Sequence, residues 1–305
     1  MPKSHAIEVR GLTRRYGTLT ALDAVSFDVA RGELFGLIGP DGAGKTTLFR
    51  LLATLLVPDA GTASVDGCDI VRDSRRIRER VGYMPGRFSL YPDLSVEENL
   101  AFFAALFGVN VRDNYDLVAP IYRRLEPFRT RRAGKLSGGM KQKLALCCAL
   151  IHRPSVLFLD EPTTGVDAVS RSEFWELLAG LKSRGITILV STPYMDEAQR
   201  CDRIALVDRG RLLGIDTPQG IVGRFDGRLY ALSGPEMYRL LCAARRMPGV
   251  GECYPFGSVH HLVAEEGFDP AAFLRQLAGE GFPDVRLGGA EPGIEDVFMK
   301  LMRHE

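Results

Sequence analysis

LFGLIGPDGAGKTT, residues 34–47, joins an apolar run to a glycine-rich turn and then to a helix-forming segment. The turn matches the pattern G-x-x-x-x-G-K-[ST], in which glycines let successive backbone N–H groups turn inward around phosphate oxygens. A helix that begins at the end of the turn adds the positive end of its dipole at the same point. The stretch therefore predicts a buried strand over residues 34–38, a phosphate-binding loop, and a helix over about residues 45–56.

The loop also supplies a charge and a metal ligand. Lys45 would reach the terminal phosphates of ATP, and the hydroxyl of Thr46 would ligate Mg²⁺. A loop that merely connects two elements is a weak alternative, because the pattern stands where a buried strand meets a helix. The candidate ATP-binding residues of this segment are Gly39, Pro40, Asp41, Gly42, Ala43, Gly44, Lys45, Thr46 and Thr47.

A second apolar run, residues 156–159, ends in the adjacent acids Asp160 and Glu161. This arrangement would deliver Asp160 to the Mg²⁺ ion, directly or through a water, and place Glu161 beside the nucleophilic water as the catalytic base. An acidic pair after a strand is only suggestive alone, because many strands end in an Asp that caps the next element. Together with the phosphate-binding loop, it predicts a Mg²⁺-dependent ATPase.

Apolar runs alternate with helix-length amphipathic segments, which is typical of an α/β protein. Ser95-Val-Glu-Glu98 has the form of a capping box and predicts the start of a helical stretch that reaches about Cys148. A turn is expected at residues 59–61. The other predicted strands cover residues 7–9, 25–29, 187–191 and 203–207, and a further helix covers residues 171–184.

Pro218 and Gly220 mark a predicted boundary, after which residues 220–305 form a smaller α+β accessory domain. Its strands and helices follow the order β-α-β-β-α-β, a candidate split-βαβ or ferredoxin-like arrangement, before a final helix over residues 294–302. The pair His260-His261 is poorly placed to share a metal, because neighbouring strand residues point to opposite faces. These histidines are expected at the surface or in a hairpin.

The overall charge does not favour a nucleic-acid partner, because 39 basic and 38 acidic residues give a net charge of +1. The longest apolar runs are far shorter than the roughly 20 residues of a membrane-spanning helix. The first ten residues lack the apolar core of a secretory signal, and the six cysteines show no disulfide-like spacing. A cytoplasmic location is therefore expected.

The segment Leu136-Ser-Gly-Gly-Met-Lys-Gln142 indicates which group of ATPases with such a phosphate-binding loop the chain resembles. Here the chain resembles the ABC ATPases, whose LSGGQ signature contacts the γ-phosphate held by the opposite subunit. A Ser hydroxyl and exposed glycine amides ahead of a helix form a second anion cradle, which makes this role physically reasonable. The resemblance implies that contact with a partner's ATP falls to Ser137, Gly138, Gly139 and Met140.

The resemblance covers residues 7–219 and implies an α/β P-loop NTPase of the ABC cassette type. Such a cassette, here residues 1–219, has a mixed sheet and a helical subdomain, here about residues 87–153. Tyr16 is similar to the aromatic residue that stacks on adenine, and Asp167 to the residue of a loop that crosses the dimer interface. Three further segments, LSGGMKQK, SLYPDLSVEENL and GIEDVFMKLM, resemble the multidrug and antibiotic-resistance exporters that serve type-2 ABC permeases. A peripheral position at the inner face of the cell membrane, through a permease, follows from this resemblance.

Two positions depart from the family pattern. Gly86 stands where the family has a glutamine that ligates Mg²⁺ and senses the permease, and Pro193 stands where it has a switch histidine. Neither residue has a side-chain hydrogen-bond donor or ligand atom. The chain's own ATP site is therefore expected to turn over slowly, and a heterodimer with a fully equipped ABC domain is favoured over a homodimer.

Two alternative functions remain besides an ATPase subunit that drives export. A regulatory or structural subunit could bind ATP as a clamp without hydrolysing it. A non-transport ABC protein acting on DNA or ribosomes is disfavoured by the near-neutral charge and by the lack of a long coiled-coil insertion.

Overall fold

Buried apolar side chains form one core within Met1–Gln219 and another within Gly220–Glu305, the two units into which the chain divides. The computed structural model describes residues 5–86 and 89–303. Across these residues, no helix combines the length and the apolar character needed to cross a bilayer.

A mostly parallel sheet lies at the centre of the first unit. In the described part of the chain its strand order is β10-β9-β3-β8-β7-β6, and only the pairing of β10 with β9 is antiparallel. Every residue of β3, β7 and β8 is buried, as expected when both faces of a parallel sheet are covered. The strands are β3 (Leu34–Ile38), β6 (Val81–Met84), β7 (Val156–Asp160), β8 (Thr187–Thr192), β9 (Arg203–Asp208) and β10 (Arg211–Asp216).

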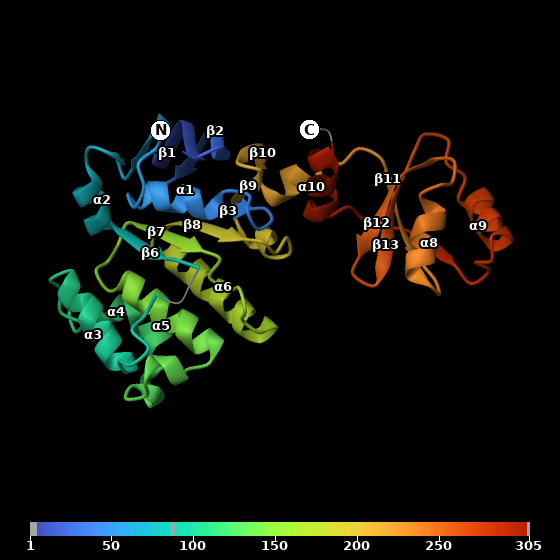
Figure 1. Ribbon diagram of the computed structural model, residues 1–305. Coiled ribbons are helices and arrows are strands. Elements are labelled where there is room, and N and C mark those ends of the chain that lie inside the picture. The colour runs from blue at the N-terminus through green and yellow to red at the C-terminus, as the bar shows by residue number, and fades with distance from the viewer. Residues whose placement is uncertain (1–4, 87–88, 304–305) are drawn as a thin grey trace. The chain divides into compact units, whose positions relative to one another are not determined.

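A smaller antiparallel sheet has the order β2-β1-β4-β5, and α1 lies between it and the parallel sheet (Figure 1). The predicted turn at residues 59–61 is wrong, because β4 already begins at Ala60 and pairs with Thr13. Gly61 permits this close pairing, since a Cβ there would lie 2.2 Å from the carbonyl oxygen of Gly11. The elements are β1 (His5–Tyr16), β2 (Leu19–Ala30), α1 (Lys45–Leu52), β4 (Ala60–Val65), β5 (Cys68–Asp69) and α2 (Ser74–Arg80).

Helices α3, α4 and α5 gather on one side of the first unit, whereas α6 covers the parallel sheet (Figure 1). The predicted capping box is confirmed: the amide of Ser95 donates to Glu98 at 2.7 Å, and the amide of Glu98 donates to the Ser95 hydroxyl at 3.2 Å. Residues 87 and 88, the expected start of the helical subdomain, lie outside the described residues. The helices are α3 (Val96–Leu106), α4 (Tyr115–Tyr122), α5 (Gly138–Leu150), α6 (Ala168–Ser183) and the 3₁₀ turns η1 (Glu126–Phe128), η2 (Ala133–Lys135) and η3 (Glu197–Arg200).

The second unit contains an antiparallel sheet whose described strands have the order β12-β13-β11-β14. With α8 after β11 and α9 after β13, this order is that of a split βαβ arrangement. The helix α7 (Pro218–Val222) spans the division between the units. The other elements are β11 (Arg228–Ser233), α8 (Met237–Ala244), β12 (Val250–Phe256), β13 (Val259–Ala264), α9 (Pro270–Gly279), β14 (Arg286–Gly289) and α10 (Ile294–Arg303).

The two histidines lie in the hairpin of β12 and β13, as expected, and they point to opposite faces of the sheet. Both are buried, so the alternative expectation of a surface position is wrong. His260 Nε2 lies 2.7 Å from the carbonyl oxygen of Met237 in α8. On the other face, His261 Nδ1 lies 2.5 Å from Asp296 Oδ1 of α10. The Asp296 carboxylate also accepts hydrogen bonds from the Tyr254 hydroxyl and the Gly293 amide, both at 2.7 Å. This buried polar cluster attaches α10 to the sheet.

Replacing Asp296 by alanine should lower the free energy of unfolding of the second unit by about 3 kcal/mol. Asp296 is only 1% exposed, so its loss leaves the buried His261 and Tyr254 without their polar partner. Urea denaturation of the full chain, followed by circular dichroism, measures the change. The exposed Glu291→Ala provides the control, and a loss below about 1 kcal/mol for Asp296→Ala would contradict the expectation.

Candidate nucleotide-binding site

The loop of residues 39–44 runs from the end of β3 to the start of α1, and close contacts explain its glycines. A Cβ on Gly39 would lie 2.1 Å from the carbonyl oxygen of Val207, so only glycine fits beside β9. Gly44 has a φ of 101°, and a Cβ there would lie 2.4 Å from the carbonyl oxygen of Ala21. The backbone of the loop is therefore held in one shape by both sheets.

Lys45 is the first residue of α1, and its side chain is only 3% exposed. Its ammonium donates to the carbonyl oxygens of Gly39 and Pro40 at 2.8 and 2.9 Å. The same Nζ lies 3.1 Å from Oε1 of Glu161, the residue that follows β7. The sequence-predicted lysine and acid are thus in direct contact.

The two predicted acids are fixed by Ser191 of β8. Its hydroxyl donates to Asp160 Oδ1 at 2.9 Å and accepts from the amide of Glu161 at 2.9 Å. Glu161 has a φ of 51°, a left-handed conformation that costs free energy for a residue with a side chain. Such conformations gather at functional sites, because the surrounding structure must compensate for them.

Two cavities of about 480 and 550 Å³ meet at this loop and share Gly42, Thr46 and Glu161. The smaller cavity brings Tyr16 together with Ala43, Gly44, Lys45 and Thr47. The larger one is lined by Asp41, Gly86 and Asp160 among others. Thr46 and Asp160 both line the larger cavity and offer the hydroxyl and carboxylate oxygens that Mg²⁺ prefers, so the residues fit this ion.

Several residues that line these cavities were not predicted from the sequence, among them Arg50, Tyr83 and Arg209. Arg50 lies four residues after Thr46 on α1, and this spacing could have indicated a shared helix face. Tyr83 lies on β6 beside β7, and burial together with the nearby Asp160 raises its pKa to about 12. No sequence pattern signals Arg209, which follows β9 with a φ of 43°.

The predicted signature segment lies at the start of α5 and lines neither of these cavities. Ser137 is the N-cap of α5, and its hydroxyl accepts a hydrogen bond from the Met140 amide at 3.4 Å. A Cβ on Gly139 would lie 2.7 Å from the hydroxyl oxygen of Ser170 in α6. Asp167 caps α6 by accepting from the Ser170 amide at 3.0 Å, and this hydrogen bond lowers the pKa of Asp167. The signature and the Asp167 loop therefore pack against each other.

Gly86 and Pro193, the two positions that depart from the family pattern, lie in different places around the site. Gly86 lines the larger cavity, and a Cβ there would lie 3.0 Å from the carbonyl oxygen of Asp160. Pro193 follows β8 and is half-buried. Neither residue brings a side-chain donor or a metal ligand to the site.

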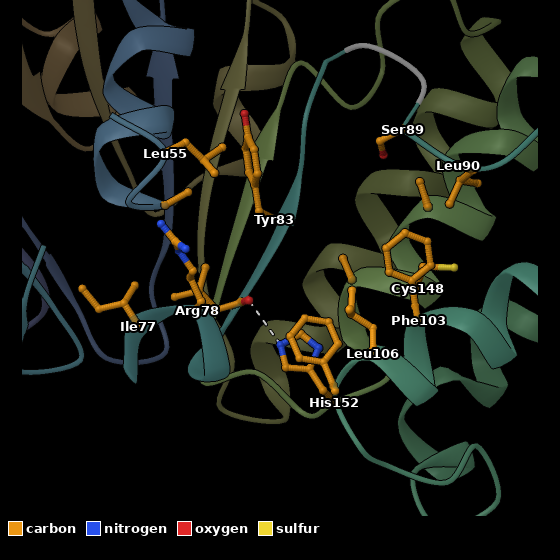
Figure 2. A pocket seen from close by; sticks show the side chains of 15 residues that line it. Leu55, Ile77, Arg78, Tyr83, Ser89, Leu90, Phe103, Leu106, Cys148 and His152 are labelled. Carbon is orange, nitrogen blue, oxygen red and sulfur yellow. Dashed lines mark hydrogen bonds between the residues drawn. The ribbon is translucent and has the colours of Figure 1, made fainter. Parts of the chain in front are cut away.

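An apolar groove of about 590 Å³ lies beside the larger cavity, and Tyr83 lines both. Figure 2 shows Leu55 and Arg78 on one side and Leu106 and His152 on the other. Leu55 and Leu106 are more than half exposed. Burial lowers the pKa of His152, whose Nε2 lies 3.2 Å from the carbonyl oxygen of Val81. The groove is thus an apolar surface in direct contact with a residue of the nucleotide site.

The parallel sheet, the glycine-rich loop before α1 and the acids at the end of β7 define a P-loop NTPase. The chain belongs to the ABC transporter ATP-binding proteins. Residues 22–164 match the ABC transporter family. Nod factor export ATP-binding protein I of Burkholderia orbicola is 38% identical over 98% of this chain and 97% of its own length.

Another relative is the probable multidrug ABC transporter ATP-binding protein YbhF of Escherichia coli, 44% identical over 72% of this chain. The matched region spans 38% of the length of YbhF. The solved ATP-binding subunit of an ABC transporter is 30% identical and covers 72% of this chain and 93% of its own, with a TM-score of 0.66. A dimeric bacterial ABC transporter cassette, 23% identical, covers 69% of this chain and 98% of its own with a TM-score of 0.63, which shows the shared fold. The predicted ABC cassette fold is therefore confirmed.

Proposed function

We propose that this chain is the ATP-binding subunit of an exporter, and that it binds and hydrolyses MgATP at an interface with a second ABC domain. The observation that carries the proposal is the pair of cavities that bring Lys45, Thr46, Asp160 and Glu161 together around one glycine-rich loop. Export is supported by two relatives, one named as a probable multidrug ABC transporter ATP-binding protein and the other as a Nod factor export ATP-binding protein.

Each residue has a role that its position supports. Lys45 and the loop amides bind the phosphates, Tyr16 stacks on adenine at the rim of the smaller cavity, and Thr46 and Asp160 hold Mg²⁺. The bound Mg²⁺ supplies positive charge that offsets the charge of the phosphate oxygens. Glu161 accepts the proton of the attacking water, after its ion pair with Lys45 is exchanged for the phosphate contact.

The site of this chain is proposed to be slow, because Gly86 and Pro193 bring no polar group to it. Its signature, Ser137 to Met140, would complete the site of a partner that has the usual glutamine and histidine. The separation of the signature from the chain's own cavities supports this division of roles. Purified protein that hydrolyses ATP alone as fast as a complete ABC dimer would contradict it.

The apolar groove is the surface that we assign to the permease. An exposed rim of Leu55 and Leu106 around an apolar hollow fits an amphipathic helix of a membrane protein. Because Tyr83 lines both the groove and the nucleotide cavity, movement of a helix in the groove would reach the site of Mg²⁺ binding directly. The chain would thereby lie at the inner face of the membrane.

Glu161→Gln in the assembled transport complex should reduce transport about tenfold, since a general base contributes about 10²–10⁴-fold and this site is already slow. The isosteric amide keeps a partner for Lys45 and cannot accept the proton. Transport into vesicles and MgATP binding by calorimetry are measured together. A loss of less than twofold with unchanged binding would favour the alternative of an ATP clamp that does not hydrolyse. The absence of MgATP binding, even with the partner subunits present, would overturn both functions.

A further inference from the structure

A buried carboxylate outside the nucleotide cavities joins the two loops that follow β7 and β8. Glu197, the first residue of η3, is 4% exposed. Its Oε2 accepts hydrogen bonds from the Thr192 hydroxyl at 2.5 Å and from the Thr163 hydroxyl at 3.0 Å. Both threonines are buried as well, so these contacts are shielded from water.

The same side chain also reaches the start of α6. Glu197 Oε1 has no hydrogen-bond partner among the described residues and lies 3.8 Å from Arg171 Nη1. The Arg171 guanidinium in turn lies over the ring of Tyr194, 4.7 Å from its centroid. A buried carboxylate is costly to desolvate, so its presence at this position calls for a reason beyond filling space.

The segments joined by Glu197 carry the reactive part of the site. Thr163 lies two residues after Glu161, and the Thr164 hydroxyl donates to Glu161 Oε2 at 3.4 Å. Arg171 is in the first turn of α6, which Asp167 caps. Thr192 precedes Pro193, and its hydroxyl accepts from the Tyr194 amide at 3.0 Å. The hydrogen bonds of Thr192 therefore hold the loop after β8 in place, although Pro193 contributes no donor of its own.

We propose that Glu197 is a positioning residue for ATP hydrolysis. It holds the segment from Glu161 to Asp167 in a fixed position relative to the end of β8. It acts through the hydroxyls of Thr163 and Thr192 and touches neither nucleotide cavity. Because a displacement of about 1 Å at a catalytic group can cost roughly 100-fold in rate, a loose segment would lower kcat more than nucleotide affinity. This inference rests on the proposed ATPase function.

The test compares variants of the full chain in single-turnover hydrolysis of [γ-³²P]ATP, with MgATP affinity and melting temperature measured on the same samples. Thr163→Val and Thr192→Val remove one hydroxyl each at nearly constant volume, whereas Thr163→Ser and Thr192→Ser retain it. We expect each valine variant to lose about tenfold in turnover rate with MgATP affinity within about threefold, and each serine variant to recover most of the rate. Glu197→Ala should lose more than either valine variant.

Glu173→Gln is the matched control, because Glu173 pairs with Lys143 and Arg124 away from the nucleotide cavities. It should lower the melting temperature without a selective loss of turnover. In the Glu197→Ala background, the valine substitutions should cause no further loss, as expected for groups that act as one unit. Valine variants that turn over within twofold of the unmodified chain, with MgATP binding intact, would overturn the positioning role alone. An unmodified chain that fails to bind MgATP would overturn the ATPase function and the positioning role with it.

Discussion

Replacing Lys45 by alanine should weaken MgATP binding by about 100-fold, which corresponds to about 2.7 kcal/mol. The ammonium lies inside the curve of the loop, against the carbonyl oxygens of Gly39 and Pro40. A hydrogen bond with a charged group contributes about 1.5–3 kcal/mol, and alanine offers none to the phosphates. Isothermal titration calorimetry of the full chain with MgATP measures the change directly.

Lys182→Ala is the control for this substitution. Lys182 lies in the last turn of α6 and is also ion-paired, here with Asp202 at 2.5 Å. It lines neither nucleotide cavity. Its loss should leave MgATP affinity within about twofold, because exposed ion pairs contribute little. The Lys45→Ala chain should still fold, since the Glu161 carboxylate that it leaves is partly exposed. An affinity that changes by less than threefold in a folded Lys45→Ala chain would show that the loop does not hold the phosphates.

The sequence was most informative where a local pattern has a single structural solution. The loop between Gly39 and Lys45, the capping box at Ser95 and the buried run before Asp160 each combine a backbone requirement with a residue type that meets it. These elements position the site, so the fold and its phosphate-binding loop could be predicted together.

Prediction failed where long-range contacts decide the outcome. Residues 59–61 look like a turn locally, yet pairing with β1 places Ala60 and Gly61 in β4. Met237 and Asp296 each bring a polar partner to a histidine of β13, and neither is near that strand in sequence. The side chains around the site show the same limit, since the contact of Glu197 with Thr163 joins residues from two different loops.

Restoring the family residues by Gly86→Gln and Pro193→His together should raise the turnover rate of the chain's own site about 100-fold. Each well-placed donor in a transition state contributes about 10²–10³-fold to the rate. Two donors would therefore raise the rate by more than about 100-fold if both side chains reached their positions without strain. The side chain at position 86 causes some strain, because its Cβ would lie 3.0 Å from the Asp160 carbonyl oxygen. The backbone must therefore shift slightly, and the expected gain is smaller. Single-turnover hydrolysis by the purified chain measures the gain.

The control for this gain fills the same positions without polar groups, as Gly86→Ala and Pro193→Ala. It imposes the same backbone change and should leave the rate within about threefold, because alanine supplies neither a Mg²⁺ ligand nor a donor to the γ-phosphate. If the control rises as much as the restored chain, the backbone and not the missing side chains limits the site. If neither rises while MgATP still binds, the slow site has another cause, and the preference for a heterodimer loses its physical basis. A rise confined to the restored chain would locate the deficiency at these two positions, because the loop, Asp160 and Glu161 are the same in all three proteins.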